Sequence, residues 1–493
     1  MADTKLLSLT VRLVDSSSLK QSTPGELFDA LNFTASYKQS ILHAATKELF
    51  VGVDFSSKEK TFDPYYQIDW LGLGASIARQ LSKTKFAKLT LHNDSSLNIT
   101  ADQLTQLILG IHQGGWQFDT YLSKQKARSR EYTVSFDDSF EGAAVDMKYV
   151  DALHVSLMLV RELVDEIPER INPKTIEAVI AKTLVGQSSV DVKMLNLNDI
   201  SKLGMEGIEF VARGSQYEPL LVHATLKPRS TVQHRICLVG KGITYDSGGL
   251  DIKTGGHMKT MKMDMAGAAT MFGAILALSK LELEHTEVHW ISAFAENMIS
   301  GSSYKADDIL TTYSGQTVEV MNTDAEGRLT LADALCYATL LDPDYIVDAA
   351  TLTGAAVVAT SEYYTPIMSN DAGLSEDLRM AFEHEQERAM AVPLPEVLRS
   401  AVAGKNSDLI NTSTLDRQAG HITAGLFLSH FVDQKHFRNS ALGIKTAKQF
   451  AWAHLDIAGT AFNSRKNSLG TDGATGHAVR SLVHWIRTQD TKK

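Results

Sequence analysis

Strand-like and helix-like segments alternate through the second half of this 493-residue chain, and this alternation limits the fold more than any other feature. Apolar strand-like runs at 287–294, 345–349 and 453–457 are separated by helical patterns at 329–341 and 422–432. Such an order predicts a mainly parallel sheet with helices on both faces. The fold class that we expect is therefore α/β.

The chain is too long for one ordinary hydrophobic core, so we expect two domains. Residues 1–147 are predicted to form a small α/β domain that ends after the acidic stretch 136–142 and carries no cluster of catalytic side chains. An amphipathic helix in residues 148–172 would link it to a larger catalytic domain, residues 173–493, which holds the mainly parallel sheet and its flanking helices.

Composition narrows the class of protein. An apolar share of 44% and a charged share of 22% are typical of soluble globular proteins. No signal-like N-terminus and no membrane-long apolar run are visible, which favours a cytoplasmic protein without membrane contact. A net charge of −10 argues against nucleic acid as a partner. The two cysteines, Cys237 and Cys336, are expected to be buried, reduced thiols.

Charged residues gather where two strand-like runs end. Lys241 and Asp246 follow the apolar run 235–239, and the motif Asp324-Ala325-Glu326-Gly327-Arg328 follows the β-branched run 317–320. In an extended chain that spacing would point all three charged groups of the motif to one side. We expect both groups at one edge of the sheet, where open α/β sheets bind ligands.

Each acidic residue also has a simpler interpretation when it is taken singly. Asp246 precedes Ser-Gly-Gly and would form a turn, and Asp264 precedes the helix-like run 266–277 and would cap it. The motif from Asp324 to Arg328 could be a solvated turn. What these interpretations leave unexplained is the gathering of so many carboxylates in one place.

Four neighbouring carboxylates would repel each other strongly unless cations lay between them. Two divalent cations satisfy that demand for Asp246, Asp264, Asp324 and Glu326. Carboxylate oxygens suit Zn, Mn or Mg, and a cluster without His or Cys favours a catalytic site open to water. Lys241 could join as a ligand only as a neutral amine, a form that a nearby dication favours by lowering its pKa.

The blocks 239–253, 261–269 and 322–329 resemble the signature blocks of the leucyl aminopeptidase family, the two-metal peptidases of family M17. The octapeptide 322–329 is the most specific of them. Segments 348–355 and 454–459 also match in order, so the resemblance spans about residues 150 to 490.

Two shorter stretches, 297–301 and 473–476, look most similar to the bacterial peptidase B branch of this family. The resemblance implies a hydrolase that removes the N-terminal residue from peptides with a free N-terminus. It also implies a homohexamer.

The resemblance further implies two divalent cations, Mn or Zn, in each subunit. The residues that would hold them are Lys241, Asp246, Asp264, Asp324 and Glu326, with Asp246 and Glu326 bridging both ions. Lys253 would stabilise the oxyanion that forms on the scissile carbonyl, and Arg328 would anchor a bicarbonate ion that acts as general base.

The pocket for the first substrate side chain matches at Met261, Thr351, Gly354, Ala458 and Ala461. Ala461 stands where animal relatives carry methionine, which should widen or reshape the pocket, so a preference for leucine is not expected. Ala266 replaces a glycine that is usual in the family, and we expect its extra methyl group to be tolerated.

Three alternatives stay open at this stage. A two-metal phosphoesterase or amidase could use similar carboxylates, although such sites usually recruit histidines. A nucleotide-binding protein is suggested by the glycines at 240–249, but the order G-x-x-x-x-G-K-[ST] is absent. A secondary DNA-binding role is the third, since some bacterial relatives bind DNA.

Overall fold

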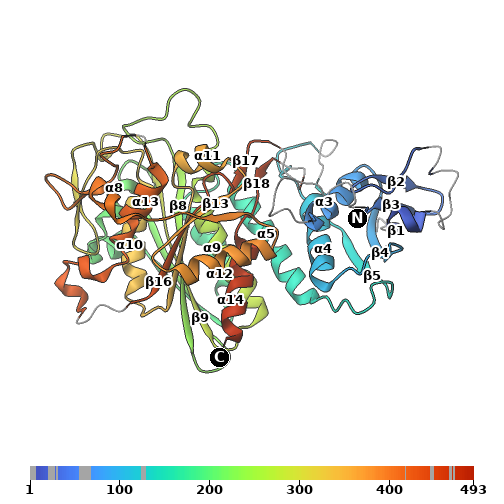
Figure 1. The fold of residues 1–493 in the computed structure, drawn as a ribbon. Helices are drawn as coiled ribbons and strands as arrows, with labels where there is room; N and C mark the ends of the chain where they lie inside the picture. Colours follow the sequence, from blue (N-terminus) through green and yellow to red (C-terminus); the bar gives the residue numbers. More distant parts are fainter. Residues whose placement is uncertain are drawn as a thin grey trace. The chain divides into compact units, whose positions relative to one another are not determined.

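The computed structural model describes residues 7–19, 28, 31–54, 68–123, 129–416, 418–444, 449–465, 469 and 472–492. It divides into two compact units, Met1–His154 with Ser464–Asp472 and Val155–Asn463 with Gly473–Lys493. Both units combine sheets with helices, which confirms the predicted α/β class (Figure 1). The division falls within helix α5 (Met147–Asp165).

The first unit is a five-stranded sheet with the strand order β2-β3-β1-β4-β5 and helices beside it. Its strands are β1 (Leu7–Val14), β2 (Ser40–His43), β3 (Glu48–Gly52), β4 (Phe86–Asn93) and β5 (Thr133–Phe136), and its helices are α1 (Ser16–Leu19), α3 (Trp70–Leu81) and α4 (Ala101–Gly115). All pairs are parallel except β2 with β3. Helix α4 begins with a capping box between Thr100 and Gln103.

The second unit is built on an eight-stranded sheet with the order β14-β13-β16-β12-β8-β9-β7-β6. Its strands are β6 (Val190–Leu195), β7 (Leu220–Leu226), β8 (His234–Asp246), β9 (Thr286–Asn297), β12 (Tyr345–Ala350), β13 (Thr365–Ser369), β14 (Ala389–Ala391) and β16 (Ala451–Asp456). The central strands β16, β12, β8 and β9 are parallel, as predicted, and antiparallel pairs join β13, β7 and β6 to this core.

Helices cover both faces of this sheet, with α8, α10 and α13 on one side and α9, α12 and α14 on the other (Figure 1). The α-helices are α6 (Pro173–Leu184), α7 (Leu197–Leu203), α8 (Glu206–Ala212), α9 (Ala266–Leu281), α10 (Gly327–Thr339), α11 (Gly354–Thr360), α12 (Ala372–His384), α13 (Gly420–Ser429) and α14 (Val479–Thr491). The 3-10 helices are η1 (Met261–Met265), η2 (Glu396–Val402), η3 (Gln434–His436) and η4 (Ser440–Leu442). Small sheets are formed by β10 (Ile309–Thr311), β11 (Thr317–Glu319) and β15 (Leu409–Ile410), and by β17 (Phe462–Asn463) and β18 (Gly473–Ala474).

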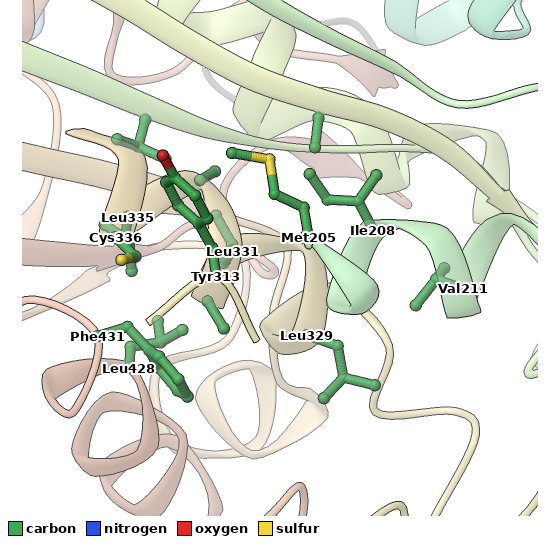
Figure 2. Packing of buried hydrophobic residues seen from close by; sticks show 14 of the residues in the cluster. Met205, Ile208, Val211, Tyr313, Leu329, Leu331, Leu335, Cys336, Leu428 and Phe431 are labelled. Carbon is green, nitrogen blue, oxygen red and sulfur yellow. The ribbon is translucent and has the colours of Figure 1, made fainter. Parts of the chain in front are cut away.

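One cluster of buried apolar side chains lies between the sheet and α10 (Figure 2). Leu331, Leu335 and Cys336 of α10 belong to it, together with Phe431 just after α13. Cys336 and Cys237 of β8 are both buried thiols, as predicted. Burial of these large apolar side chains stabilises the position of α10. The first turn of this helix carries site residues.

On the other face, the segment Met261–Leu281 is apolar and long enough to cross a membrane by length and composition, with a mean hydropathy of 1.3 in its most apolar window. Within the structure, 83% of that window is buried inside the unit, where α9 packs on β8 and β12. A fully apolar circumference is what a core helix between a sheet and an outer helix layer needs.

Two local expectations were wrong. Strand β8 does not end at residue 239 but continues to Asp246, paired with β9 almost throughout, so Lys241 lies inside the strand. The run 317–320 does not extend the main sheet either, because β11 pairs with β10 and β15 in a separate small sheet. The motif from Asp324 onwards therefore reaches the strand ends of the main sheet through a loop.

A buried ion pair ties the two central strands β12 and β16 together. Asp348 and His454 face each other across the strand pair, neither is exposed, and Oδ1 of Asp348 lies 2.6 Å from Nδ1 of His454. The other carboxylate oxygen accepts a hydrogen bond of 2.8 Å from Trp452. Burial alone would lower the pKa of His454, but Asp348 raises it above its ordinary value.

We therefore expect Asp348→Asn to lower the free energy of unfolding by about 3–5 kcal/mol, because breaking a buried pair leaves its partner uncompensated. Since the pKa of His454 is raised in the folded state, the contribution of the pair is full below its ordinary pKa of about 6.5 and is lost as the pH rises through the raised value. Urea unfolding at pH 6 and pH 9 measures this. The exposed pair Glu376–Arg379 on α12 is the control, and Glu376→Gln should cost about 0–1 kcal/mol at both pH values. An equal loss for Asp348→Asn at both pH values would contradict the ionic pairing.

Candidate active site

One pocket of about 1070 Å³ at the carboxyl ends of the parallel strands collects the predicted site residues. Its wall includes Lys241, Asp246, Lys253, Met261, Asp264, Asp324, Arg328, Thr351, Gly354 and Ala458. Glu326 lies 2.9 Å from the Nζ atom of Lys241 and is buried. These residues come from β8 and the loop after it, η1, the loop before α10 and its start, and the segments after β12 and after β16.

Lys241 is the buried cation at the base of the pocket. Its Nζ atom lies 2.8 Å from both carboxylate oxygens of Asp264 and 2.9 Å from Oε1 of Glu326, and it donates to the backbone oxygen of Thr351. Burial alone would lower the pKa of this lysine, but Asp264, Glu326 and Asp246 raise it above its ordinary value. Lys241 therefore serves as the positive partner of the surrounding carboxylates.

Lys253 is the second cation and lies nearer to the mouth of the pocket. Its Nζ atom is 2.8 Å from Oδ2 of Asp246 and 2.5 Å from Oδ1 of Asp324. Burial would again lower its pKa, and the charge of Asp246 together with hydrogen bonds to both aspartates raises it. The side chain keeps 14% of its surface exposed, so it can face a molecule in the pocket.

Neighbouring polar groups fix the orientation of the carboxylates. Oδ1 of Asp246 accepts hydrogen bonds of 2.9 Å from the side chain of Asn297 and from the backbone N–H of Gly248. Oδ1 of Asp264 accepts one of 2.8 Å from the hydroxyl of Thr351. Asn297 was not expected from the sequence as a supporting residue. Its signal is its place at the end of β9, directly opposite Asp246 in the parallel register.

The negative charge in the pocket exceeds the lysine charge. Burial, followed by the charge of Glu326, raises the pKa of Asp246 to about 6, and burial is also the largest cause that raises the pKa of Asp264 and of Glu326. Asp246, Asp264 and Glu326 each offer an oxygen, and these oxygens lie within 4.8 Å of one another. Four carboxylates thus share two ammonium groups.

Several of these oxygens have unused bonding capacity. Oδ2 of Asp264, Oδ1 of Asp324 and Oε1 of Glu326 are buried and accept no well-directed hydrogen bond from the described residues, although each lies within 2.9 Å of a lysine Nζ atom. Buried anionic oxygens of this kind are the ligands that hard divalent cations take. The residues present therefore fit a metal centre.

Arg328 lies in the first turn of α10, half-buried at the pocket wall. Burial lowers its pKa to about 10, against the opposing charges of Glu326 and Asp456, so it remains a cation at neutral pH. Its buried Nε atom donates no hydrogen bond to the described part of the chain. A guanidinium held in this way can receive an anion from the pocket.

The predicted substrate residues separate into two groups. Met261, Thr351, Gly354 and Ala458 line the pocket. Ala461 is buried at the approach to β17 and is not among the described residues of the wall, so its part in substrate preference stays a prediction.

The sequence indicated only the first residue of helix α11, Gly354, as part of the pocket wall. Val357 and Val358 of this helix line the pocket, and Val358 is 89% exposed. His421, at the start of α13, also lines it. The two adjacent valines, which follow Thr353 closely in the sequence, were a signal of an apolar pocket wall that could have been used.

Two expectations about the acidic segments were wrong. Asp264 does not cap α9, because it lies in η1 and its carboxylate turns to Lys241 and Thr351. The extended geometry assumed for the motif was also wrong, because Glu326 has helical dihedral angles and α10 begins at the next residue. Ala266 has ordinary helical angles, with φ −62° and ψ −29°, which any residue with a side chain adopts.

An α/β sheet that gathers buried carboxylates and lysines in a pocket at its strand ends fits the class of metal-dependent enzymes. Residues 158–483 match the family described as "Cytosol aminopeptidase family, catalytic domain". The chain belongs to this family and is a peptidase of the aminopeptidase class. This membership decides against the phosphoesterase alternative.

Relatives in the same family cover most of the chain. A probable cytosol aminopeptidase of Persephonella marina is 39% identical over 392 residues, which is 79% of this chain and 75% of the relative. One of Aquifex aeolicus is 35% identical over 438 residues, covering 88% and 83%. One of Sulfurihydrogenibium sp. is 36% identical over 446 residues, covering 89% and 84%.

Gly327 gives a direct test of the geometry around Lys241. A Cβ atom at this position would lie 2.2 Å from Cε and 2.6 Å from Nζ of Lys241. Gly327→Ala must therefore displace the lysine from its carboxylates, and we expect kcat/KM for an aminoacyl substrate to fall on the order of 10²-fold, as for other misplacements of about 1 Å. Gly301→Ala is the control, because a Cβ atom there meets nothing within 4 Å. Unchanged activity in a folded Gly327→Ala protein would show that the position of Lys241 is not critical.

Proposed function

We propose that this aminopeptidase removes single residues from the N-terminus of peptides with two divalent cations, Mn or Zn, held in the acidic pocket. The observation that carries the proposal is the set of oxygens from Asp246, Asp264 and Glu326, buried within 4.8 Å of one another and paired with too few cations.

The ions would be held by Lys241, Asp246, Asp264, Asp324 and Glu326, with Asp246 and Glu326 shared between both. When bound, the two ions supply Lewis-acid activation of water and of the scissile carbonyl. Lys241 must give up its proton to become a ligand, because an ammonium group has no lone pair. Its raised pKa means that protons compete with metal loading at this position.

Lys253 is proposed to stabilise the oxyanion on the scissile carbonyl. It is a cation, it keeps part of its surface open to the pocket, and Asp246 and Asp324 hold its Nζ atom from two sides. A preorganised ammonium group in a half-buried pocket stabilises developing negative charge more than water does.

Arg328 is proposed to anchor a bicarbonate ion that accepts the proton of the attacking water. The support is its half-buried guanidinium at the pocket wall, with the Nε–H group available for an anion. A bicarbonate ion bound to Arg328 would lie beside the carboxylates. It would supply a proton acceptor that is not a side chain of the protein.

The first side chain of the substrate would lie against Met261, Thr351, Gly354 and Ala458, with Ala461 behind this wall. The small residues among them, Gly354, Ala458 and Ala461, leave room for side chains other than leucine. The exposed valines of α11 offer an apolar surface beside the same pocket.

At the level of the whole molecule, we propose a cytoplasmic homohexamer with the catalytic domain in residues 173–493. Residues 148–172 would link it to the domain of residues 1–147. These assignments follow the family resemblance.

Metal content separates the proposed roles. Glu326→Ala should lose metal and turnover together, whereas Lys253→Ala should keep its metal and lose about 10²–10³-fold in kcat, because the oxyanion loses its partner while all the proposed metal ligands remain. Elemental analysis and steady-state kinetics of Mn-loaded and Zn-loaded proteins measure both quantities. Arg328→Ala should be milder, since added bicarbonate can partly replace an anchored base. Loss of metal by Lys253→Ala as complete as by Glu326→Ala would contradict the role given to Lys253.

Acetylated peptides test which end is cut. Acetylation removes the lone pair of the α-amine, so acetylated peptides should resist hydrolysis while free peptides of varied length are trimmed stepwise. Activity on free peptides should rise with pH as the α-amine, whose ordinary pKa is about 7.7–8.0, loses its proton. Mass spectrometry of the products measures this, with Glu326→Ala as the inactive control. If the active enzyme cleaved an acetylated peptide internally and the Glu326→Ala variant did not, the protein would be an endopeptidase.

A further inference from the structure

A second group of metal-ligating side chains lies away from the pocket, where helices α12 and α14 pack side by side (Figure 1). It consists of His384, the last residue of α12, Glu385, which directly follows it, and His484 in the second turn of α14. None of the three lines the active-site pocket.

Their distances suit a tetrahedral ion. Oε1 of Glu385 lies 3.3 Å from Nδ1 of His384 and 3.6 Å from Nδ1 of His484. Each residue offers a ligand atom within 4.8 Å of the other two. Zinc bonds of about 2.0–2.1 Å at tetrahedral angles place ligand atoms about 3.3–3.4 Å apart, so the spacing between the carboxylate oxygen and each Nδ1 atom suits an ion.

Burial also favours a fixed ligand. Glu385 is only 1% exposed at its side chain, and Arg480 reaches its other oxygen at a distance of 3.9 Å, so the carboxylate is held in place. The imidazole rings of His384 and His484 stack with centroids 3.9 Å apart and planes 19° apart. Each ring must therefore turn about its side-chain bonds before its Nδ1 lone pair, which lies in the ring plane, points at a shared ion.

We propose that His384, Glu385 and His484 bind one further transition-metal ion, with zinc as the preferred ion and water at the fourth position. His384 is exposed, so the ion can enter from solvent. The bound ion joins the end of α12 to α14 and stabilises that helix pair.

The two metal sites differ in ligand chemistry. Imidazole ligands suit Zn, Cu and Ni, whereas Mn and Mg prefer the oxygen ligands of the active-site pocket. We therefore expect manganese to bind in the active-site pocket but not to His384, Glu385 and His484. Zinc should bind at both sites. This difference makes the two sites separable in one experiment.

The test compares bound zinc per subunit in the full-length protein, the double variant His384→Ala/His484→Ala and the control His436→Ala, after zinc loading and dialysis. His436 is also exposed and lies 3.5 Å from Asp433, but it belongs to no three-ligand group among the described residues. We expect one equivalent of zinc fewer in the double variant only, with unchanged activity when manganese is supplied. Equal zinc content in all three proteins would overturn the proposal.

A second measurement needs no substitution. Diethyl pyrocarbonate modifies accessible histidines, and peptide mapping of the unaltered protein reports each site. Zinc should protect His384 and His484 and leave His436 reactive, whereas manganese should protect none of them. Equal modification of His384 and His484 with and without zinc would rule out the site.

Discussion

Buried negative charge that must be balanced is the constraint on which the catalytic unit depends. Asp246, Asp264 and Glu326 are almost fully enclosed, and their carboxylates are held together by the Nζ atoms of Lys241 and Lys253 at 2.8–2.9 Å. Enclosing ionised groups costs several kcal/mol each unless partners are placed accurately. The surrounding fold supplies that accuracy: β8 fixes Lys241 and Asp246 on one rigid strand, and β9 adds Asn297 in register beside them.

The rigidity of the strands comes in turn from the layers on either side. Helix α9 is buried around nearly its whole circumference, and α10 is anchored by the apolar cluster that contains Leu331, Leu335 and Phe431. Between these layers, the Asp348–His454 pair crosses the centre of the parallel sheet. Charged groups near the strand ends can therefore be held in strained electrostatic arrangements, because apolar packing around them supplies the stability.

Much of this could be predicted from sequence because the relevant signals are local. Alternating segments gave the parallel sheet, and the residues of the pocket wall followed from blocks of matching sequence. What could not be predicted was how the segments meet. Asp264 looked like a helix cap because its true partner, Lys241, is distant in sequence. Glu326 looked like part of a strand because the predicted helix starts at residue 329, whereas α10 already starts at Gly327. His384 and His484 are a hundred residues apart along the chain and carry no motif, so only the packing of α12 on α14 brings them together.

The close approach of Gly327 to Lys241 has a consequence for how the enzyme comes into being. The first turn of α10 covers the aliphatic end of the lysine, so the ammonium group and its carboxylates are enclosed only when that helix has docked on β8. In a chain in which α10 has not docked, the apolar face of the sheet is exposed to water. Lys241 and its carboxylates are then not yet enclosed. The charged centre of the pocket therefore forms in the same step that completes the packing of α10 on the sheet.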